Sequence, residues 1–196
     1  MIPIPRQAPL VLASASPRRA QLLEQAGIPF LVDVSAIEEI LDPTWSPAEA
    51  VVELARQKAH DVAVRHLGGE VVLAADTVVV VEGRIHGKPR DEADARHMLA
   101  ALSDRWHEVY TGWCLVLPEG ERVGVERTDV HFAPLDEETI ARYVATGEPL
   151  DKAGAYAIQG RGSLFVDAIR GDYHNVVGLP VHAIGRALLQ SGFLVI

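Results

Sequence analysis

A single carboxylate lies inside an apolar stretch of this sequence. Asp76, followed by Thr77, interrupts a run of small and aliphatic residues that extends from Val71 to Val81. A carboxylate in a buried strand loses its hydration, which is unfavourable unless a cation or a metal ion compensates. The alternative is a bulge or strand break in which Asp76 caps a neighbouring group. Because binding sites collect at strand ends in α/β sheets, we interpret Asp76 as a functional residue.

Hydroxyl and guanidinium groups gather near the start of the chain, in Ser14-Ala15-Ser16-Pro17-Arg18-Arg19. The segment follows an apolar run and opens a predicted helix, with Ser16 as N-cap and Pro17 at the first helical position. Unpaired N–H groups at a helix start, two hydroxyls and two guanidinium groups suit a phosphate. A plain helix cap with two solvated arginines has the same pattern, so both interpretations stay open.

Two lysines occupy positions from which they could reach an anion. Lys58 falls on the apolar stripe of a predicted helix, on or beside its buried face. The commoner fate of such a lysine is to extend to solvent, and a phosphate contact is the sharper alternative. Lys88 projects from the stiff loop Gly87-Lys88-Pro89-Arg90-Asp91, which could also be an exposed turn.

Two other segments have side chains suited to a metal ion or a base. The pair Glu38-Glu39 offers the oxygen ligands that hard divalent cations prefer, although such pairs are more often simply solvated. In the segment 151–160, small residues allow a ligand to approach the backbone, and Gln159 can both donate and accept hydrogen bonds, as recognition of a base edge requires. The alternative is a tight connecting loop.

The elements that must position these groups alternate between strand and helix patterns, which predicts an α/β or α+β fold. We expect strands over residues 10–13, 30–34, 71–81, 109–117 and 122–132. We expect helices over 17–26, 47–66, 91–102 and 179–190, and another from Asp136. Pro118-Glu119-Gly120 joins two of the strands as a hairpin. The stretch 146–162 has no long helix or strand pattern, which is typical of a functional segment.

Composition excludes several classes of protein. The 196 residues carry a net charge of −9, which argues against a nucleic-acid-binding protein because duplex binding needs a basic face. The sole cysteine, Cys114, fits a reducing compartment and reads as a core residue. No apolar run is long enough to span a membrane, and Met1 to Gln7 lacks the apolar core of a signal peptide. We therefore expect a cytoplasmic protein.

Five motifs then point in one direction. In chain order they are Leu12-Ala13-Ser14-Ala15-Ser16-Pro17-Arg18-Arg19, Ala75-Asp76-Thr77, Lys88-Pro89-Arg90-Asp91, Asp151-Lys152-Ala153-Gly154-Ala155-Tyr156 and Gly178-Leu179-Pro180. Their ordered combination closely resembles the Maf family of nucleoside triphosphate pyrophosphatases over nearly the whole chain. The string that ends Ala155-Tyr156-Ala157-Ile158-Gln159-Gly160 resembles the dTTP/UTP branch of that family.

The resemblance implies a fold and a reaction. The fold would be the Maf fold, similar to inosine triphosphate pyrophosphatases: a single α/β domain over residues 1–196 with a central mixed sheet, flanking helices and a cleft between two lobes. The reaction would be hydrolysis of dTTP or UTP to the monophosphate and pyrophosphate with a divalent metal cation, Mg²⁺ or Mn²⁺. A homodimer is a further expectation.

The resemblance also implies roles for individual residues. Asp76 would be the catalytic proton acceptor and, with Glu39, a metal ligand. Arg18, Thr77 and Gln159 would determine substrate specificity. The phosphate contacts would be Ser14, Ser16, Arg19, Lys58 and Lys88.

Two alternatives to this function stay open. One is a pyrophosphatase of the same fold that acts on 7-methyl-GTP or another modified nucleotide. The other is a non-catalytic, nucleotide-binding regulator of cell division. Asp76 argues against a pure binding protein, because an anion site gains nothing from a negative group beside a triphosphate.

Overall fold

A seven-stranded mixed sheet forms the centre of the protein. The computed structural model describes residues 9–194, so the prediction made for Met1 to Gln7 lies outside the described residues. The strands are β1 (Leu10–Leu12), β2 (Phe30–Val32), β3 (Val71–Val81), β4 (Arg84–His86), β5 (Trp106–Leu117), β6 (Gly120–Phe132) and β7 (Val166–Arg170). Their order is β2-β1-β3-β5-β6-β7, with β4 paired to β3. β1 runs parallel to β2 and β3, and the remaining pairs are antiparallel.

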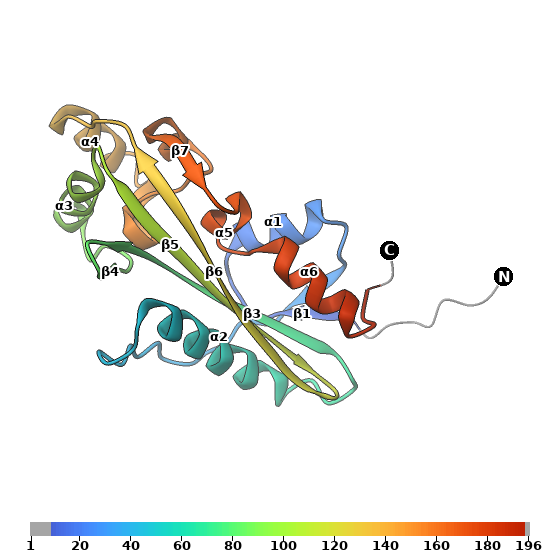
Figure 1. Cartoon of the computed structure of the whole chain (residues 1–196). Coiled ribbons are helices and arrows are strands. Elements are labelled where there is room, and N and C mark those ends of the chain that lie inside the picture. The colour runs from blue at the N-terminus through green and yellow to red at the C-terminus, as the bar shows by residue number, and fades with distance from the viewer. Residues whose placement is uncertain (1–8, 195–196) are drawn as a thin grey trace.

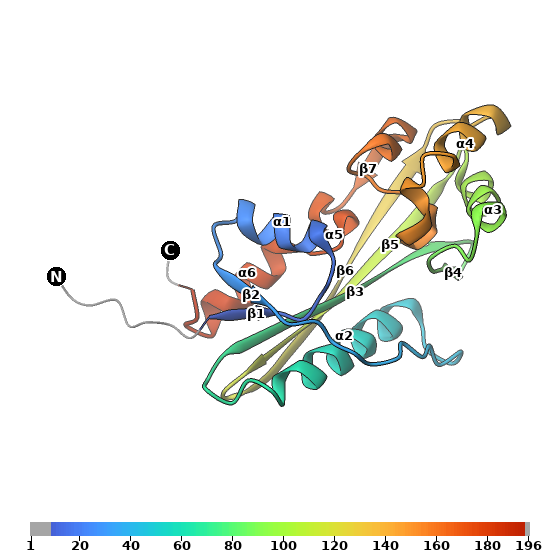
Figure 2. The same ribbon diagram turned by 180° about the vertical axis from the view of Figure 1, so that it is seen from behind.

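Helices cover both faces of this sheet. They are α1 (Pro17–Gln25), α2 (Pro47–Ala63), α3 (Glu92–Leu102), α4 (Glu137–Val144), α5 (Tyr173–Val177) and α6 (Val181–Gln190), with short 3₁₀ turns at Glu148–Asp151, Ala153–Ala155 and Arg161–Phe165. α2 lies against one face, whereas α1, α5 and α6 lie on the other (Figure 1). The view from behind shows the same separation (Figure 2). The predicted α/β class, with a central mixed sheet and flanking helices, is confirmed.

The burial of the aliphatic residues explains this arrangement. Along β3, alternate residues point to opposite faces. Leu73 and Val79 join the large core beneath α1, α3, α4 and α6. Val72 and Val78 pack on the other face against the apolar stripe of α2, which includes Val51 and Val62. Both faces of β3 are therefore buried, which is why its sequence is almost continuously apolar.

One edge of β3 is interrupted, and this interruption opens the sheet. β1 pairs with β3 only as far as Leu73, and β4 pairs with it from Val79 onward. Between these two points, the described strands leave that edge of β3 without a neighbour. Asp76 and Thr77 lie in this gap, so a ligand can reach them from the side of the sheet.

Most of the predicted elements are confirmed, and their ends differ in a few places. β3 has the predicted bounds, and the β5–β6 hairpin turns where expected. β2 ends at Val32 rather than residue 34, because its partner β1 ends at Leu12. α2 ends at Ala63 rather than residue 66, where the backbone tightens into turns. The short elements β4, β7 and α5 were not predicted.

Two helix starts also refine the predictions. Ser46 forms the expected capping box with Glu49 at the start of α2. α6 begins at Val181 rather than residue 179, with Pro180 as its N-cap.

In the described part of the chain, no helix is long and apolar enough to span a membrane.

Candidate active site

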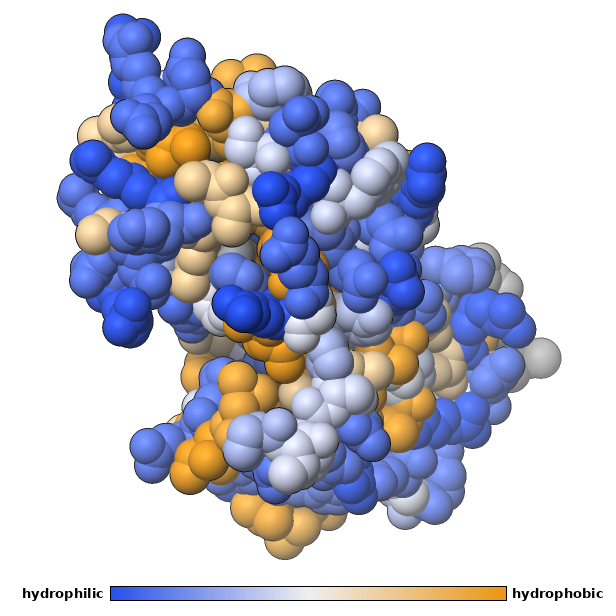
Figure 3. Space-filling model, turned by 60° about the vertical axis from the view of Figure 1, so that its left-hand side comes forward, coloured by the Kyte–Doolittle hydropathy of each residue, from blue (hydrophilic) through white to orange (hydrophobic). Residues whose placement is uncertain are grey.

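A cavity of about 600 Å³ lies beside the interrupted edge of β3. The space-filling view shows the molecule hollowed between an upper and a lower mass (Figure 3). All ten residues that the sequence analysis assigned to the site line this cavity: Ser14, Ser16, Arg18, Arg19, Glu39, Lys58, Asp76, Thr77, Lys88 and Gln159. Segments far apart in the sequence are therefore brought to one place, while the role of each residue stays a prediction.

Asp76 forms a buried ion pair with Lys58. The Lys58 ammonium lies 2.6 Å from Asp76 Oδ1 and 2.9 Å from Glu39 Oε1. Asp76 is only 8% exposed, and Lys58 only 9%. Of the two interpretations left open for Lys58, extension to solvent is wrong, because the side chain is buried between α2 and the sheet. Its charge instead supplies the compensation that a carboxylate in an apolar strand requires.

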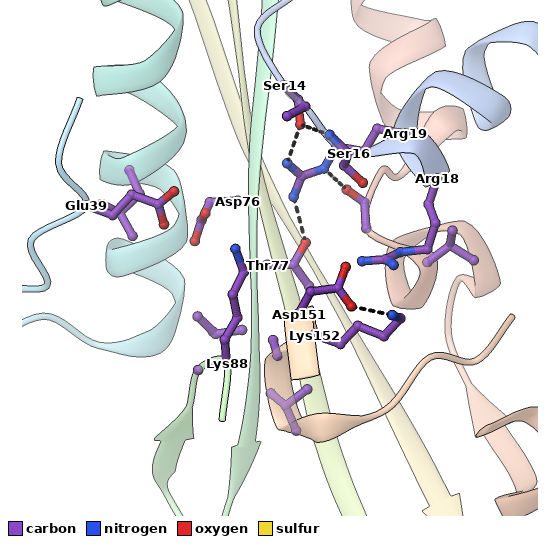
Figure 4. A pocket seen from close by; sticks show the side chains of 18 of the residues that line it. Ser14, Ser16, Arg18, Arg19, Glu39, Asp76, Thr77, Lys88, Asp151 and Lys152 are labelled. Atoms are coloured by element: carbon purple, nitrogen blue, oxygen red, sulfur yellow. Dashed lines mark hydrogen bonds and ion pairs between the residues drawn. The ribbon is translucent and has the colours of Figure 1, made fainter. Parts of the chain in front are cut away.

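Glu39 completes this cluster from a loop after β2. Its side chain is half exposed. Burial acts to raise the pKa of Glu39, but the hydrogen bond from Lys58 and the nearby charge of Lys88 outweigh it and hold that pKa below its usual value. The carboxylate is therefore ionised at neutral pH. Lys88 extends its amine toward Asp76 (Figure 4).

Gly112 sets how closely α2 approaches the sheet, and the sequence analysis did not single it out. It is the partner of Asp76 across the β3–β5 ladder. A Cβ at this position would lie 2.4 Å from the carbonyl carbon of Val51, in the first half of α2. Only a glycine allows this contact. Because Lys58 lies two turns further along the same helix, the approach permitted by Gly112 also fixes the distance from Lys58 to Asp76.

Arg19 joins the N-terminal segment to the C-terminal part of the chain. Its guanidinium donates to the Gly178 carbonyl at 2.8 Å, to Ser14 Oγ at 3.1 Å and to Thr77 Oγ1 at 3.3 Å (Figure 4). Burial lowers the pKa of Arg19, and the charge of Asp76 opposes this. Arg19 is thus held on the face of β3 opposite to α2, with its orientation fixed by three segments.

A buried chain of hydroxyls continues this network below Thr77. Thr77 Oγ1 lies 2.9 Å from Thr111 Oγ1, and Thr111 donates to the Asn175 carbonyl at 2.9 Å. The Asn175 amide in turn donates to Thr128 Oγ1 and to the Val109 carbonyl. This network fixes the rotamer of Thr77, whose neighbour Asp76 points to the other face.

The start of α1 faces the cavity. Ser16 is the N-cap as predicted, but among the described residues its side chain caps no N–H group of the helix. Its hydroxyl therefore remains available to a ligand. Arg18 points its guanidinium toward the carboxylate of Asp151 across the cavity (Figure 4).

Asp151 and Lys152 also line the cavity, although the sequence analysis gave neither a separate role. Lys152 Nζ lies 2.5 Å from Asp151 Oδ1 and 2.6 Å from the Glu148 carbonyl. Burial acts to raise the pKa of Asp151, but Lys152 and Arg18 outweigh it and lower that pKa. The signal that could have found them was their place in the fourth motif.

The donor set fits a divalent cation that is shared with a substrate. Asp76 and Glu39 approach the same Lys58 ammonium, so their carboxylates lie close together. Within residues 9–194, no group of three or more histidine, cysteine, aspartate or glutamate residues could enclose a metal. Mg²⁺ is commonly held in this way, by one or two carboxylates, water and substrate phosphates.

A family model and several named proteins match this chain over nearly all of its length. A family model described as Maf-like protein matches residues 9–191. The dTTP/UTP pyrophosphatase of Symbiobacterium thermophilum is 53% identical over 184 residues, which is 94% of each chain. That of Halalkalibacterium halodurans is 55% identical over 185 residues, covering 94% of this chain and 97% of the relative.

Among solved structures, the Ham1 protein of Staphylococcus aureus superimposes on this chain with a TM-score of 0.49 and is 18% identical to it in sequence. The match covers 93% of this chain and 98% of that chain, and we base no conclusion on this likeness. The family model and the relatives, by contrast, match nearly the entire chain, including every segment that lines the cavity. The chain therefore belongs to the Maf-like protein family.

Proposed function

We propose that this protein is a nucleoside triphosphate pyrophosphatase that hydrolyses dTTP and UTP to the monophosphate and pyrophosphate. The observation that carries the proposal is the buried pair of Asp76 and Lys58 in a cavity rimmed by cations, in a chain that is more than half identical to proteins named dTTP/UTP pyrophosphatase. A pure anion-binding site would have no use for the carboxylate.

The cations of the cavity suit the binding of a polyphosphate. Lys88 and Arg18 reach in from opposite sides of the cavity (Figure 4), and the start of α1 supplies backbone N–H groups and the Ser16 hydroxyl. Positive charges and N–H groups of this kind stabilise the charge that develops on transferred and leaving phosphoryl groups. Arg19 contributes its charge, and three of its five N–H groups already donate to Gly178, Ser14 and Thr77.

The chemical step needs a water molecule and a proton acceptor. In our proposal the water oxygen attacks the α-phosphorus, the bond from that phosphorus to the oxygen bridging to the β-phosphorus breaks, and pyrophosphate leaves. Asp76 accepts the proton of the attacking water. The Lys58 ammonium, 2.6 Å from Asp76 Oδ1, holds that carboxylate in place before the substrate arrives.

We propose Mg²⁺ or Mn²⁺ as the cofactor, held by Asp76 and Glu39 together with substrate phosphates. Such an ion, when bound, lowers the pKa of its water and neutralises phosphate charge. Asp76 could then act chiefly as a ligand rather than as the base.

The direct test of the proposed function is pyrophosphate release by Asp76→Asn, with Asp104→Asn as the matched control. Asp104 is exposed and lies outside the cavity lining. We expect Asp76→Asn to lose at least about a thousandfold in kcat, a loss typical of central catalytic groups, and to keep its circular dichroism spectrum. The control should behave as the wild type. Near-normal turnover by Asp76→Asn would refute the assignment.

A substrate panel separates the alternatives. We expect dTTP and UTP to be hydrolysed with the highest kcat/KM among natural and methylated nucleoside triphosphates. A strong preference for 7-methyl-GTP would replace the pyrimidine assignment. Tight nucleotide binding without product, across several divalent metals, would favour the regulator of cell division.

We also propose a cytoplasmic location and a homodimer. The sole cysteine, Cys114, lies buried in β5, and burial raises the pKa of its thiol to about 12, which suits an unreactive core residue in a reducing compartment. The homodimer rests on the family resemblance and is tested by light scattering of the purified chain.

A further inference from the structure

The turn that contains Gln159 is held by hydrogen bonds to one carboxylate, that of Glu148, which lies outside the cavity. Glu148 lies in the 3₁₀ turn Glu148–Asp151 and is half buried. Its Oε2 accepts a hydrogen bond from the Arg161 N–H at 3.2 Å, and its Oε1 accepts one from the Gly162 N–H at 3.1 Å. Both bonds fall just after Gln159, so they fix the exit of the turn in which Gln159 lies.

A tyrosine ties the entrance of the same turn to the same carboxylate. The Tyr143 hydroxyl donates to Glu148 Oε1 at 2.9 Å and accepts from the Ala157 N–H at 3.3 Å. Tyr143 is itself buried against Phe165, with ring centroids 4.8 Å apart. The backbone on both sides of Gln159 is therefore anchored through Glu148, directly on one side and through Tyr143 on the other.

The turn is closed tightly enough to depend on these bonds. A Cβ on Gly162 would lie 2.4 Å from the Ala157 carbonyl oxygen and 2.9 Å from the Tyr143 hydroxyl, so the two ends of the turn are in direct contact. Burial acts to raise the pKa of Glu148, but the N–H groups of Gly162 and Arg161 outweigh it and lower that pKa. The carboxylate therefore stays ionised, which suits a group that accepts three hydrogen bonds.

From this geometry we infer that Glu148 is a positioning residue for base recognition: it holds Gln159 where its amide meets the edge of a uracil or thymine ring. The inference rests on the proposed function, because it assigns the base end of that same cavity. Glu148 itself does not line the cavity. Gln159, Ala157 and Ile158 do, and they lie within the turn that Glu148 anchors.

The chemistry of the two pyrimidine types makes this positioning measurable. Uracil and thymine present a carbonyl acceptor beside an N–H donor, whereas cytosine presents an amino donor beside a ring-nitrogen acceptor. A fixed amide can match the first pattern with its own donor and acceptor, and it then opposes the second. An amide on a loosened turn can rotate to suit either base. Loss of Glu148 should therefore weaken discrimination rather than chemistry.

The experiment compares Glu148→Gln and Tyr143→Phe with Glu138→Gln as the matched control. The glutamine side chain keeps the size of Glu148 but turns a donor toward one of the N–H groups. Tyr143→Phe removes the hydroxyl that links the Ala157 N–H to Glu148 and leaves the bonds from Arg161 and Gly162 to Glu148 in place. Glu138 is exposed on α4, where it pairs with Arg142, and it takes no part in the turn. Calorimetry measures binding of UMP, CMP and inorganic tripolyphosphate, and pyrophosphate release measures UTP hydrolysis.

We expect Glu148→Gln to weaken UMP binding about tenfold and CMP binding less than about twofold, so that selectivity between them falls at least about fivefold, as for one misplaced hydrogen bond. Tripolyphosphate has no base, so its binding should not change. In UTP hydrolysis, KM should rise with little change in kcat. Tyr143→Phe should show the same direction with a smaller effect, and Glu138→Gln should match the wild type.

Two results would overturn the inference. One is unchanged selectivity between UMP and CMP in Glu148→Gln. The other is an equal weakening of tripolyphosphate and UMP, which would mean general damage to the cavity. Failure of the proposed function has a different signature: the wild type would release no pyrophosphate from UTP. If UMP selectivity is then still lost in Glu148→Gln, the positioning role stands without the hydrolysis.

Discussion

Replacing Gly112 by alanine should separate α2 from the sheet and disturb the pair of Lys58 and Asp76. The added methyl group would lie 2.4 Å from the carbonyl carbon of Val51, 2.5 Å from its oxygen and 2.6 Å from the nitrogen of Val52. All three are backbone atoms in the middle of a helical turn, so no side chain can rotate away to make room. The helix as a whole has to move.

The size of the effect follows from these distances. Ordinary contacts of a Cβ begin at 3.4 Å, so α2 must retreat by about 1 Å. Overpacking of this kind costs about 1–3 kcal/mol of stability. The same retreat would stretch the 2.6 Å contact between Lys58 and Asp76 toward the limit of a hydrogen bond. Misplacement of a catalytic group by about 1 Å costs about a hundredfold in rate.

Urea unfolding and pyrophosphate release measure the two effects separately. Gly185→Ala is the matched control, because a Cβ at Gly185, within α6, meets no atom within 4 Å. An alanine there should leave kcat unchanged and raise stability by up to about 1 kcal/mol, through helix propensity. If Gly112→Ala unfolds at the wild-type urea concentration and retains its kcat, then Gly112 does not determine where α2 sits.

Three further substitutions test other parts of the structure. Lys58→Met leaves the buried Asp76 without its cation, so we expect urea unfolding to show a loss of about 3–5 kcal/mol at neutral pH; a loss below about 1 kcal/mol would mean that solvent compensates the carboxylate. Thr111→Val keeps the side-chain shape but removes the buried hydroxyl between Thr77 and the Asn175 carbonyl. In the same assay this variant should lose about 1–3 kcal/mol of unfolding free energy. An unchanged unfolding free energy would show that the network adds no stability. Burial, with a smaller contribution from His131, lowers the pKa of His107 from 6.5 to about 3. The stability from neutral His107 is present above about pH 6.5 and is lost as the pH falls toward 3, by about 2 kcal/mol between about pH 8 and about pH 5. In His107→Gln, whose amide can still reach Tyr156, this part of the pH dependence should be missing, and an unchanged slope would contradict the burial of a neutral ring.

The strand that contains Asp76 could be predicted from its long run of small and aliphatic residues. An apolar run of this length with glycine close to both ends is typical of a strand buried on both faces, and Asp76 is conspicuous within it. The buried face of α2 could likewise be read from the spacing of its aliphatic residues, which placed Lys58 correctly.

The contacts between elements could not be predicted in the same way. Nothing in the local sequence says that Lys58 faces Asp76, because that depends on how α2 crosses the sheet. Gly112 looks like any glycine in a strand until Val51 is seen against it. Glu148 lies in a stretch without periodicity, where backbone acceptors and donors from distant residues decide the conformation.

The short elements were missed for a related reason. β7 has five residues and pairs only with β6, and α5 has five residues and is held by its Asp172 cap and by Asn175. Neither is long enough to show a hydrophobic period. The network beneath Thr77 holds α5 through Asn175, and the ladder with β6 holds β7.

The three hydrogen bonds of Arg19 have a consequence for how the protein acquires its activity during synthesis. One of the bonds crosses 159 positions of the chain, from a residue near the beginning to Gly178 close to the end. A polypeptide emerging from the ribosome can assemble β1, β2 and β3 early, yet the guanidinium lacks its carbonyl acceptor until α5 has been made. Until then Arg19 has only its Ser14 and Thr77 acceptors, so this wall of the cavity reaches its full set of hydrogen bonds only near the end of translation.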